Sequence, residues 1–265
     1  TAFDTMAWWA RSGLMDIVRP SENSTPANPP IGMGDQPTGV ALFASIMTAL
    51  YRREKTGKGG EVHTSLMANG AWSNGSFIQA GLFGAQFPDR KEPSPLHPFG
   101  GRYKTKDNRY LILAIIDANK EWPKLLKALD IEYFNEDPRF SSFKKMNENF
   151  MILYEELKKI FIQYSLKEIT EKLRFSEVTF GVLSHSNDHS KDQQFIESEV
   201  LVKFDKGSFD EDFFTVNSPI FLENESKKIP TKAPKLGEHT KEILSSLGQD
   251  EEEIAQLKQD GIIDF

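Results

Sequence analysis

Helical spacing of apolar residues predicts three helices in the first third of the chain. The stretch from Phe3 to Met15 is apolar on one face, and Gly13 is a typical residue for the end of such a helix. The stretch from Met67 to Phe83 is apolar and rich in small residues, which favours a buried helix packed closely against its neighbours. Between them, Val40 to Arg53 has a broad apolar face formed by Leu42, Phe43, Ile46, Met47, Ala49 and Leu50.

The segments that separate these helices predict a loop, a turn and a strand. Arg19 to Pro30 is rich in Pro, Ser and Asn, which is typical of a loop. Glu61 to Leu66 alternates polar and apolar residues and predicts a strand. No Walker-type pattern is present, so a helix end followed by a tight turn explains the glycines that precede this strand, Gly57, Gly59 and Gly60.

A proline-rich stretch from Phe87 to Gly101 predicts a linker and a domain boundary. Its prolines are Pro88, Pro93, Pro95 and Pro98. Beyond it, Arg102 to Ile116 predicts a hairpin that turns at Lys106 to Arg109. Amphipathic patterns then predict helices over Glu121 to Leu129, Phe150 to Gln163 and Leu166 to Leu173.

The last third of the chain predicts short strands and two terminal helices. Ser184 to Gln194 is polar and is expected to be a loop. Strand-like runs are Thr179 to Leu183, Val200 to Phe204 and Phe213 to Leu222. The closing helices are one that ends at Leu247 and one from Asp250 to Gln259.

Composition and charge exclude several function classes. A formal net charge of −7, with Lys and Arg scattered among acidic residues, would repel a phosphate backbone, so we expect no nucleic-acid partner. The chain has no cysteine, which excludes disulfides, thiolate metal sites and a Cys nucleophile. Because no run of 18 apolar residues and no export signal is present, we expect a soluble cytoplasmic protein without membrane contact.

The strongest candidate for chemistry is Asp35, which lies at the predicted start of the second helix in the segment GDQPTG, Gly34 to Gly39. Two interpretations compete. An Asp before a helix is commonly an N-cap, worth about 1 kcal/mol. A carboxylate can also act as a nucleophile that carries an acyl group. The local sequence alone favours the cap.

Three separated segments together resemble the class III CoA-transferases, the family that includes formyl-CoA:oxalate and carnitine CoA-transferases. The first is GDQPTG with its helix and the following YRREKTGKG, residues 51–59. The second is FGGRYKTKD, residues 99–107, with its hairpin. The third is LGEHT, residues 236–240, followed by a helix and an acidic stretch. The combination favours the nucleophile interpretation of Asp35.

The resemblance implies an α/β fold, part of a Rossmann-like CoA-transferase large domain plus a small α+β domain. Residues 1–90 would form part of the large domain, residues 98–194 the small domain, and residues 195–265 a return to the large domain. Family members extend considerably further upstream of Thr1, where most contacts to the CoA nucleotide are expected. The chain is therefore either a fragment of a longer protein or a form that lacks this part.

The resemblance also implies a reaction and its residues. CoA would pass from an acyl-CoA thioester to a free carboxylic acid through an aspartyl anhydride and an aspartyl-CoA thioester on Asp35. Backbone N–H groups at Gly34 and in a glycine loop at Gly100 and Gly101 would stabilise the oxyanions, although the two loop glycines are equally well explained as turn residues. CoA enters as part of the substrate, so no bound cofactor and no metal is implied. An interlocked homodimer is expected if the upstream part is present.

Two alternatives remain open for the function. An α-methylacyl-CoA racemase-like isomerase would use acid and base residues, typically with a His shortly upstream of the Asp, and no His occurs between Thr1 and Asp35. A non-catalytic remnant or partner subunit of a CoA-transferase would keep the core without nucleotide binding.

Histidine and tryptophan residues offer weaker candidates. His185 and His189 have metal-ligand spacing if helical, but their segment predicts a loop and no HExxH pattern is present. His63 and His239 are expected to be structural. The tryptophans at positions 8 and 9 are on an apolar helix, where aromatic residues are usually core rather than pocket lining.

Overall fold

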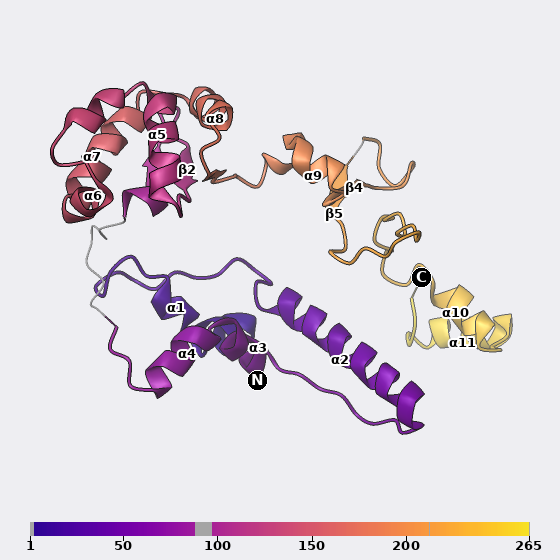
Figure 1. Ribbon diagram of the computed structural model, residues 1–265. Helices are drawn as coiled ribbons and strands as arrows, with labels where there is room; N and C mark the ends of the chain where they lie inside the picture. The colour runs from indigo at the N-terminus through magenta and orange to yellow at the C-terminus, as the bar shows by residue number, and fades with distance from the viewer. Residues whose placement is uncertain (1–2, 88–96, 212, 265) are drawn as a thin grey trace. The chain divides into compact units, whose positions relative to one another are not determined.

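The computed structural model describes residues 3–87, 97–211 and 213–264 (Figure 1). The chain divides into two compact units, Thr1–Gly181 and Val182–Phe265. The linker prolines Pro88, Pro93 and Pro95 lie outside the described residues. The three-part division into residues 1–90, 98–194 and 195–265 stays a prediction.

The first 87 residues are helical, as the spacing predicts, with differences in detail. Their elements are η1 (Thr5–Ala10), α1 (Leu14–Ile17), α2 (Asp35–Thr56), α3 (Leu66–Ser73) and α4 (Gly75–Leu82). The first helix is a π-helix, and Gly13 follows it with a φ of 83°, a left-handed conformation that glycine adopts without strain. Arg19 to Pro30 is irregular, as predicted.

The prediction of one helix over Met67 to Phe83 is wrong, because the helix breaks at Asn74 into α3 and α4. The buried Asn74 side chain turns away from the helix: its Nδ2 donates a hydrogen bond to the carbonyl oxygen of Ser12 at 2.6 Å. This bond joins α3 and α4 to the start of the chain across 62 residues.

The predicted burial of this segment is also wrong. Gly70 is the buried residue of α3, whereas Trp72 is 88% exposed, and α2 and α4 have no buried residue. Gly70 is buried because α3 crosses η1 so closely that a Cβ on Gly70 would lie 3.0 Å from the Cα of Trp8. Within the described residues the apolar face of α2 is left largely uncovered, although its hydrophobic pattern is typical of a helix that packs on a core.

The strand predicted over Glu61 to Leu66 is not formed. Residues 58–65 have no regular secondary structure, and Ser65 caps α3 by accepting a hydrogen bond from the N–H of Ala68. A strand requires a neighbouring strand to pair its backbone N–H and C=O groups. No described segment pairs with this one.

Residues 97–181 contain the hydrophobic core of the first unit. Figure 1 shows helices α5 to α8 gathered with β2. The elements are η2 (Pro98–Gly100), β1 (Arg102–Lys104), β2 (Tyr110–Leu113), α5 (Ala118–Leu129), η3 (Glu132–Glu136), α6 (Phe143–Glu148), α7 (Phe150–Phe161), α8 (Leu166–Phe175) and β3 (Phe180–Val182). The strands form one sheet in the order β1-β2-β3. The predicted hairpin, three helices and strand are all confirmed.

Strand alternation explains how the hairpin seals this core. Antiparallel pairing places Tyr103 opposite Leu111, and both side chains are fully buried, whereas their strand neighbours point outward. Helices α5, α7 and α8 cover the buried face with Leu125, Leu126, Leu129, Leu153, Leu157, Phe161, Ile169 and Leu173. The capping box of Ser165 and Glu168 fixes the start of α8.

Replacing Leu157 with Ala should lower the free energy of unfolding by about 2–5 kcal/mol, because the side chain is fully buried and its loss leaves a cavity. Met151→Ala on the same helix is the control: this side chain is 56% exposed, and we expect a change below about 0.5 kcal/mol. Urea unfolding followed by far-ultraviolet circular dichroism measures both. Equal midpoints for the two variants would contradict this core.

Residues 182–264 form a smaller unit of short elements. These are η4 (His189–Lys191), α9 (Gln193–Glu197), β4 (Leu201–Lys203), β5 (Phe214–Val216), α10 (Thr240–Ser246) and α11 (Glu251–Gln259). β4 and β5 pair antiparallel, with Val202 opposite Thr215. The predicted terminal helices are confirmed. The loop predicted over Ser184 to Gln194 contains η4 and the start of α9, and the run Phe213 to Leu222 is a strand over three residues.

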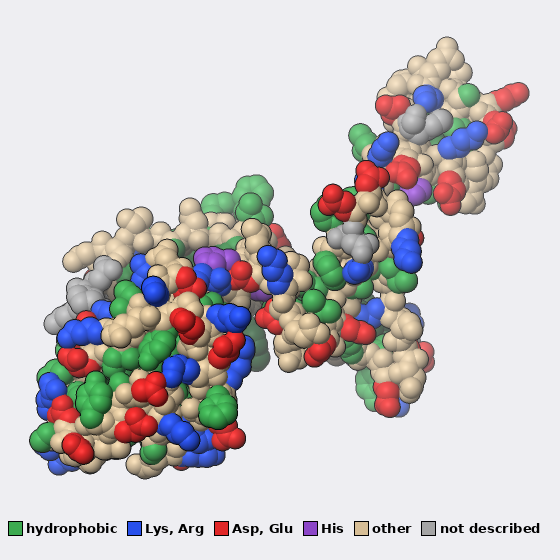
Figure 2. Space-filling view, turned by 90° about the horizontal axis from the view of Figure 1, so that it is seen from above, with side chains coloured by type: hydrophobic (Ala, Val, Ile, Leu, Met, Phe, Trp, Pro, Cys, Tyr) green, Lys and Arg blue, Asp and Glu red, His purple; other side chains and the backbone are tan. Residues whose placement is uncertain are grey.

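Over the described ranges, no helix combines the length and the apolar character that crossing a bilayer requires. On the face shown in Figure 2, basic and acidic side chains are interspersed.

Candidate active site

Asp35 is the first residue of α2, and its side chain is exposed. The N-cap interpretation of Asp35 is wrong, because the N-cap position belongs to Gly34 and no side chain caps the helix. Among the described residues, none donates a hydrogen bond or forms an ion pair with the Asp35 carboxylate. The N-terminus of a 22-residue helix favours the negative charge of this carboxylate. Asp35 is therefore an accessible anion at a fixed place on the backbone.

Gly34 is held from two sides by residues of the first helix. Its N–H donates a hydrogen bond of 3.3 Å to Oδ2 of the buried Asp4. A Cβ at position 34 would lie 2.6 Å from the Cβ of Trp8 and 3.0 Å from the Cβ of Asp4. These contacts leave no room for a side chain, so glycine is required here by close approach rather than by an unusual φ.

The π-helix η1 places Asp4 and Trp8 at this contact. Asp4 is the N-cap of η1, and its Oδ1 accepts a hydrogen bond of 2.6 Å from the N–H of Thr5. Trp8 and Trp9 are buried and stack with ring centroids 5.9 Å apart, which confirms that they are core residues. Nε1 of Trp9 donates to the carbonyl oxygen of Ala27 at 2.9 Å, whereas Nε1 of Trp8 is buried without a described partner.

Gly100 and Gly101 lie in the turn before β1, and their backbone donors are in use. The N–H of Gly100 donates to the carbonyl oxygen of His97 at 2.9 Å, and that of Gly101 to the carbonyl oxygen of Pro98 at 3.2 Å. A Cβ on Gly101 would lie 2.7 Å from the Tyr154 ring, whereas nothing lies within 4 Å of one on Gly100. Gly101 thus serves the packing of the small core.

The turn also supports Tyr103, whose hydroxyl donates to the carbonyl oxygen of Pro98 at 2.7 Å. Burial raises the pKa of Tyr103 well above its usual value, and the nearby Tyr154 adds to the shift. Tyr103 is therefore a neutral hydrogen-bond donor that fixes this turn.

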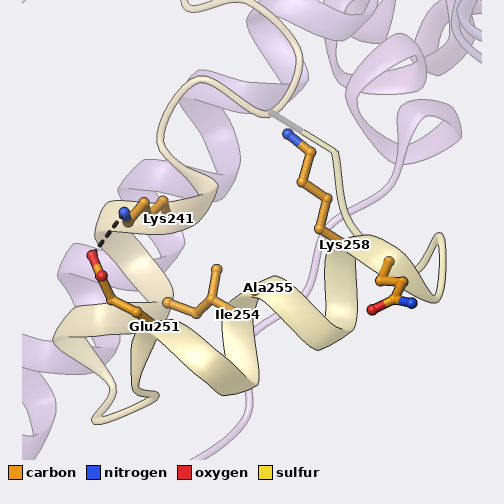
Figure 3. A pocket seen from close by; sticks show the side chains of 6 residues that line it. Lys241, Glu251, Ile254, Ala255 and Lys258 are labelled. Atoms are coloured by element: carbon orange, nitrogen blue, oxygen red, sulfur yellow. Dashed lines mark hydrogen bonds and ion pairs between the residues drawn. The ribbon is translucent and has the colours of Figure 1, made fainter.

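Cavities occur in both units of the described chain. One, of about 630 Å³, is lined by residues of α1, α4 and their neighbours, including Ser12, Asn74 and Phe77. Another, of about 470 Å³, lies between α10 and α11 (Figure 3), where Lys241 and Glu251 form an ion pair of 2.9 Å. The hydrogen bond from Lys241 lowers the pKa of Glu251. An exposed ion pair of this kind contributes little stability, and neither cavity includes Asp35.

The histidines do not form a metal centre in the described part of the chain. His185 lies in an irregular segment and His189 begins η4, where its ring stacks on Phe195. No group of three metal-ligating side chains is present among the described residues. His239 is the N-cap residue of α10 but makes no side-chain cap, and His63 is exposed in the irregular segment before α3.

Comparison with known proteins defines the class of fold. The chain is similar to the crystal structure of a CAIB/BAIF family protein from Brucella suis, with a TM-score of 0.77 and 21% sequence identity over 92% of this chain and 62% of that one. This likeness confirms the predicted mixed helix-and-sheet fold.

A family model described as CoA-transferase family III matches residues 1–240. The chain is 32% identical to (R)-2-hydroxy-4-methylpentanoate CoA-transferase of Clostridioides difficile, over 99% of this chain and 65% of that protein. It is 25% identical to cinnamoyl-CoA:phenyllactate CoA-transferase of Clostridium sporogenes, over 97% of this chain and 63% of that protein. The chain belongs to CoA-transferase family III, and it spans somewhat less than two thirds of the length of these relatives.

The sequence did not predict the contacts of Gly34 with Asp4 and Trp8. Asp4 is the one acidic residue in the apolar stretch from Phe3 to Met15, and this pattern does not indicate its partner. Trp8 fits a core pattern equally well without Gly34. The structure brings Gly34, the residue before Asp35, into contact with these two residues, and the described contacts of Gly100 and Gly101 are with residues 97–181.

Proposed function

We propose that the protein transfers CoA from an acyl-CoA thioester to a free carboxylic acid, with Asp35 as the carrier. Family membership supports the reaction class. The observation that carries the proposal is the exposed carboxylate of Asp35 at the start of α2, which has no hydrogen bond or ion pair with a described residue and follows the tightly held Gly34. A carboxylate is the group that forms both an anhydride and a thioester.

The chemistry balances without a proton donor, a metal or a redox partner. The Asp35 carboxylate attacks the thioester carbonyl of the donor, the carbon–sulfur bond breaks, and CoA thiolate leaves a mixed anhydride on Asp35. The thiolate then attacks the Asp35 carbonyl and releases the donor acid, which leaves an aspartyl-CoA thioester. The acceptor carboxylate attacks this thioester, which frees CoA thiolate and forms a second mixed anhydride on Asp35. The thiolate attacks the acceptor carbonyl of this anhydride, the bond to Asp35 breaks, and acceptor acyl-CoA and the free Asp35 carboxylate result. CoA is substrate throughout, and the proposal includes no resident cofactor.

Each step passes through an oxyanion that needs fixed positive dipoles. The N–H groups of Gly34, Gly100 and Gly101 already donate hydrogen bonds within the protein. Each would have to break its bond before it could donate to an oxyanion. The N-terminal dipole of α2 supplies positive potential beside Asp35.

The test is an assay on the whole natural protein with acyl-CoA thioesters and free acids in D₂O. The relatives named above make 2-hydroxy-4-methylpentanoate, phenyllactate and cinnamoyl-CoA the first compounds to try. We expect a new acyl-CoA, with no deuterium at the carbon next to the thioester. Deuterium at that carbon without a new thioester would establish a racemase-like isomerase instead, and neither product would favour a non-catalytic partner subunit.

The proposal extends to assembly and compartment. Leu42, Ile46 and Met47 on α2 are 38–41% exposed, and the remaining length of the relatives supplies chain that would cover such a face. We expect the whole protein to be a homodimer in the cytoplasm, interlocked as its family suggests. Sedimentation equilibrium measures the assembly, and a monomer would overturn it.

A further inference from the structure

The carboxylate of Asp4 is divided between two backbone amides that lie far apart in the sequence. Its Oδ1 accepts from the N–H of Thr5 at 2.6 Å, and its Oδ2 accepts from the N–H of Gly34 at 3.3 Å. Asp4 is only 9% exposed. The first bond is local and ends on the first residue of η1. The second spans 30 residues and ends on the residue that precedes Asp35.

The bond to Gly34 fixes the part of the backbone from which the Asp35 side chain extends. Gly34 is the N-cap residue of α2, and its N–H has no partner within the helix. On one side lies Trp8, whose Cβ would be 2.6 Å from a Cβ added to Gly34. On the other side Asp4 holds the amide. The Asp35 side chain has no hydrogen bond from the described residues, so its position depends on how Asp4 and Trp8 hold Gly34.

Only a carboxylate of this length satisfies both amides. An ionised Asp accepts hydrogen bonds at both oxygens, whereas Asn accepts at one and donates at the other. In Asp4→Asn, one of the two amides therefore faces an NH₂ group. A displacement of a reacting group by about 1 Å costs on the order of 10²-fold in rate.

We propose that Asp4 is a positioning residue for the nucleophile, which holds Asp35 in place through the Gly34 amide. The inference rests on the proposed function of Asp35. Asp4 touches no substrate in this account and acts through Gly34 alone. Substitution should therefore slow the attack of Asp35 and leave the binding of the thioester nearly unchanged.

The test compares Asp4→Asn and Asp4→Glu with the wild type in the whole natural protein. Asp4→Glu keeps the charge and both acceptor oxygens but moves them by one methylene group. We expect the kcat of both variants to fall about 10- to 100-fold, with a KM for acyl-CoA within about twofold of the wild type. The matched control is Asp117→Asn, which removes the cap carboxylate of α5 without contact to Gly34. Its kcat should equal that of the wild type.

A second readout does not depend on activity. Hydrogen exchange of the peptide that covers residues 31–39 should be faster in Asp4→Asn than in the wild type and unchanged in Asp117→Asn. Wild-type kcat and exchange in both Asp4 variants would overturn the positioning role and leave the proposed function standing. Transfer that persists without modification of Asp35 in the wild type would overturn the proposed function, and the role of Asp4 with it. Loss of stability with unchanged kcat in the folded protein would reduce Asp4 to a helix cap.

Discussion

Asp35→Asn should lose CoA transfer by on the order of 10³-fold or more while the protein folds as before. An amide does not attack a thioester, and removal of a covalent nucleophile typically costs a factor of this size or larger. The free energy of unfolding should change little, because the side chain is exposed and has no hydrogen bond from the described residues. Loss of its interaction with the helix dipole costs about 0.3–1 kcal/mol.

The matched control for Asp35→Asn is Glu242→Gln, which removes an exposed acidic residue from the first turn of another helix, α10. Both variants should unfold at nearly the same temperature as the wild type, and only Asp35→Asn should lose kcat/KM. Thermal unfolding by circular dichroism and a thioester exchange assay provide the two measurements. Transfer at the wild-type rate by Asp35→Asn would remove Asp35 from the mechanism.

Gly34→Ala should destabilise the protein by about 1–3 kcal/mol, the cost of adding a methyl group to a packed site. The added Cβ would lie 2.6 and 2.7 Å from Cβ and Cγ of Trp8, and both atoms belong to a buried side chain that cannot move aside freely. The backbone must shift instead. This shift moves Asp35, so we expect transfer to fall together with stability.

Gly39→Ala on the same helix is the control for Gly34→Ala, and the expected sign is opposite. Nothing lies within 4 Å of a Cβ at position 39, and replacing a helical Gly with Ala stabilises by roughly 0.5–1 kcal/mol. Urea unfolding of the two variants decides the matter. If Gly34→Ala is as stable as Gly39→Ala, the close contact between η1 and the start of α2 does not exist in solution.

The sequence predicted the secondary structure best in the segment whose helices and strands pack against one another. The hairpin and the helices α5, α7 and α8 lie within 80 residues of one another and bury each other's apolar faces, so local patterns match the structure. The pattern of α2 is just as apolar, yet its face is exposed in the described residues. The strand expected at Glu61 to Leu66 has the right alternation but no described partner. Patterns indicate which face is apolar and do not indicate what covers it.

The candidate site divides in the same way. The segment GDQPTG predicted Asp35 and Gly34 as neighbours at a helix start, because this information is local. The bonds that hold the site are not local: Asp4 reaches Gly34 across 30 residues, and Asn74 reaches Ser12 across 62. No periodicity in the sequence encodes such pairs. The glycines at 100 and 101 were predicted as possible oxyanion donors, and their N–H groups are engaged in the turn before β1.

The most direct test of the account is peptide mass analysis of the whole natural protein after incubation with an acyl-CoA substrate and hydroxylamine. Hydroxylamine attacks an aspartyl anhydride or an aspartyl thioester and leaves a hydroxamate on the carboxylate that carried it. We predict a hydroxamate on Asp35 that forms only when acyl-CoA is present and is absent from Asp35→Asn. An unmodified Asp35 in a protein that transfers CoA, or a hydroxamate on another carboxylate, would contradict the account.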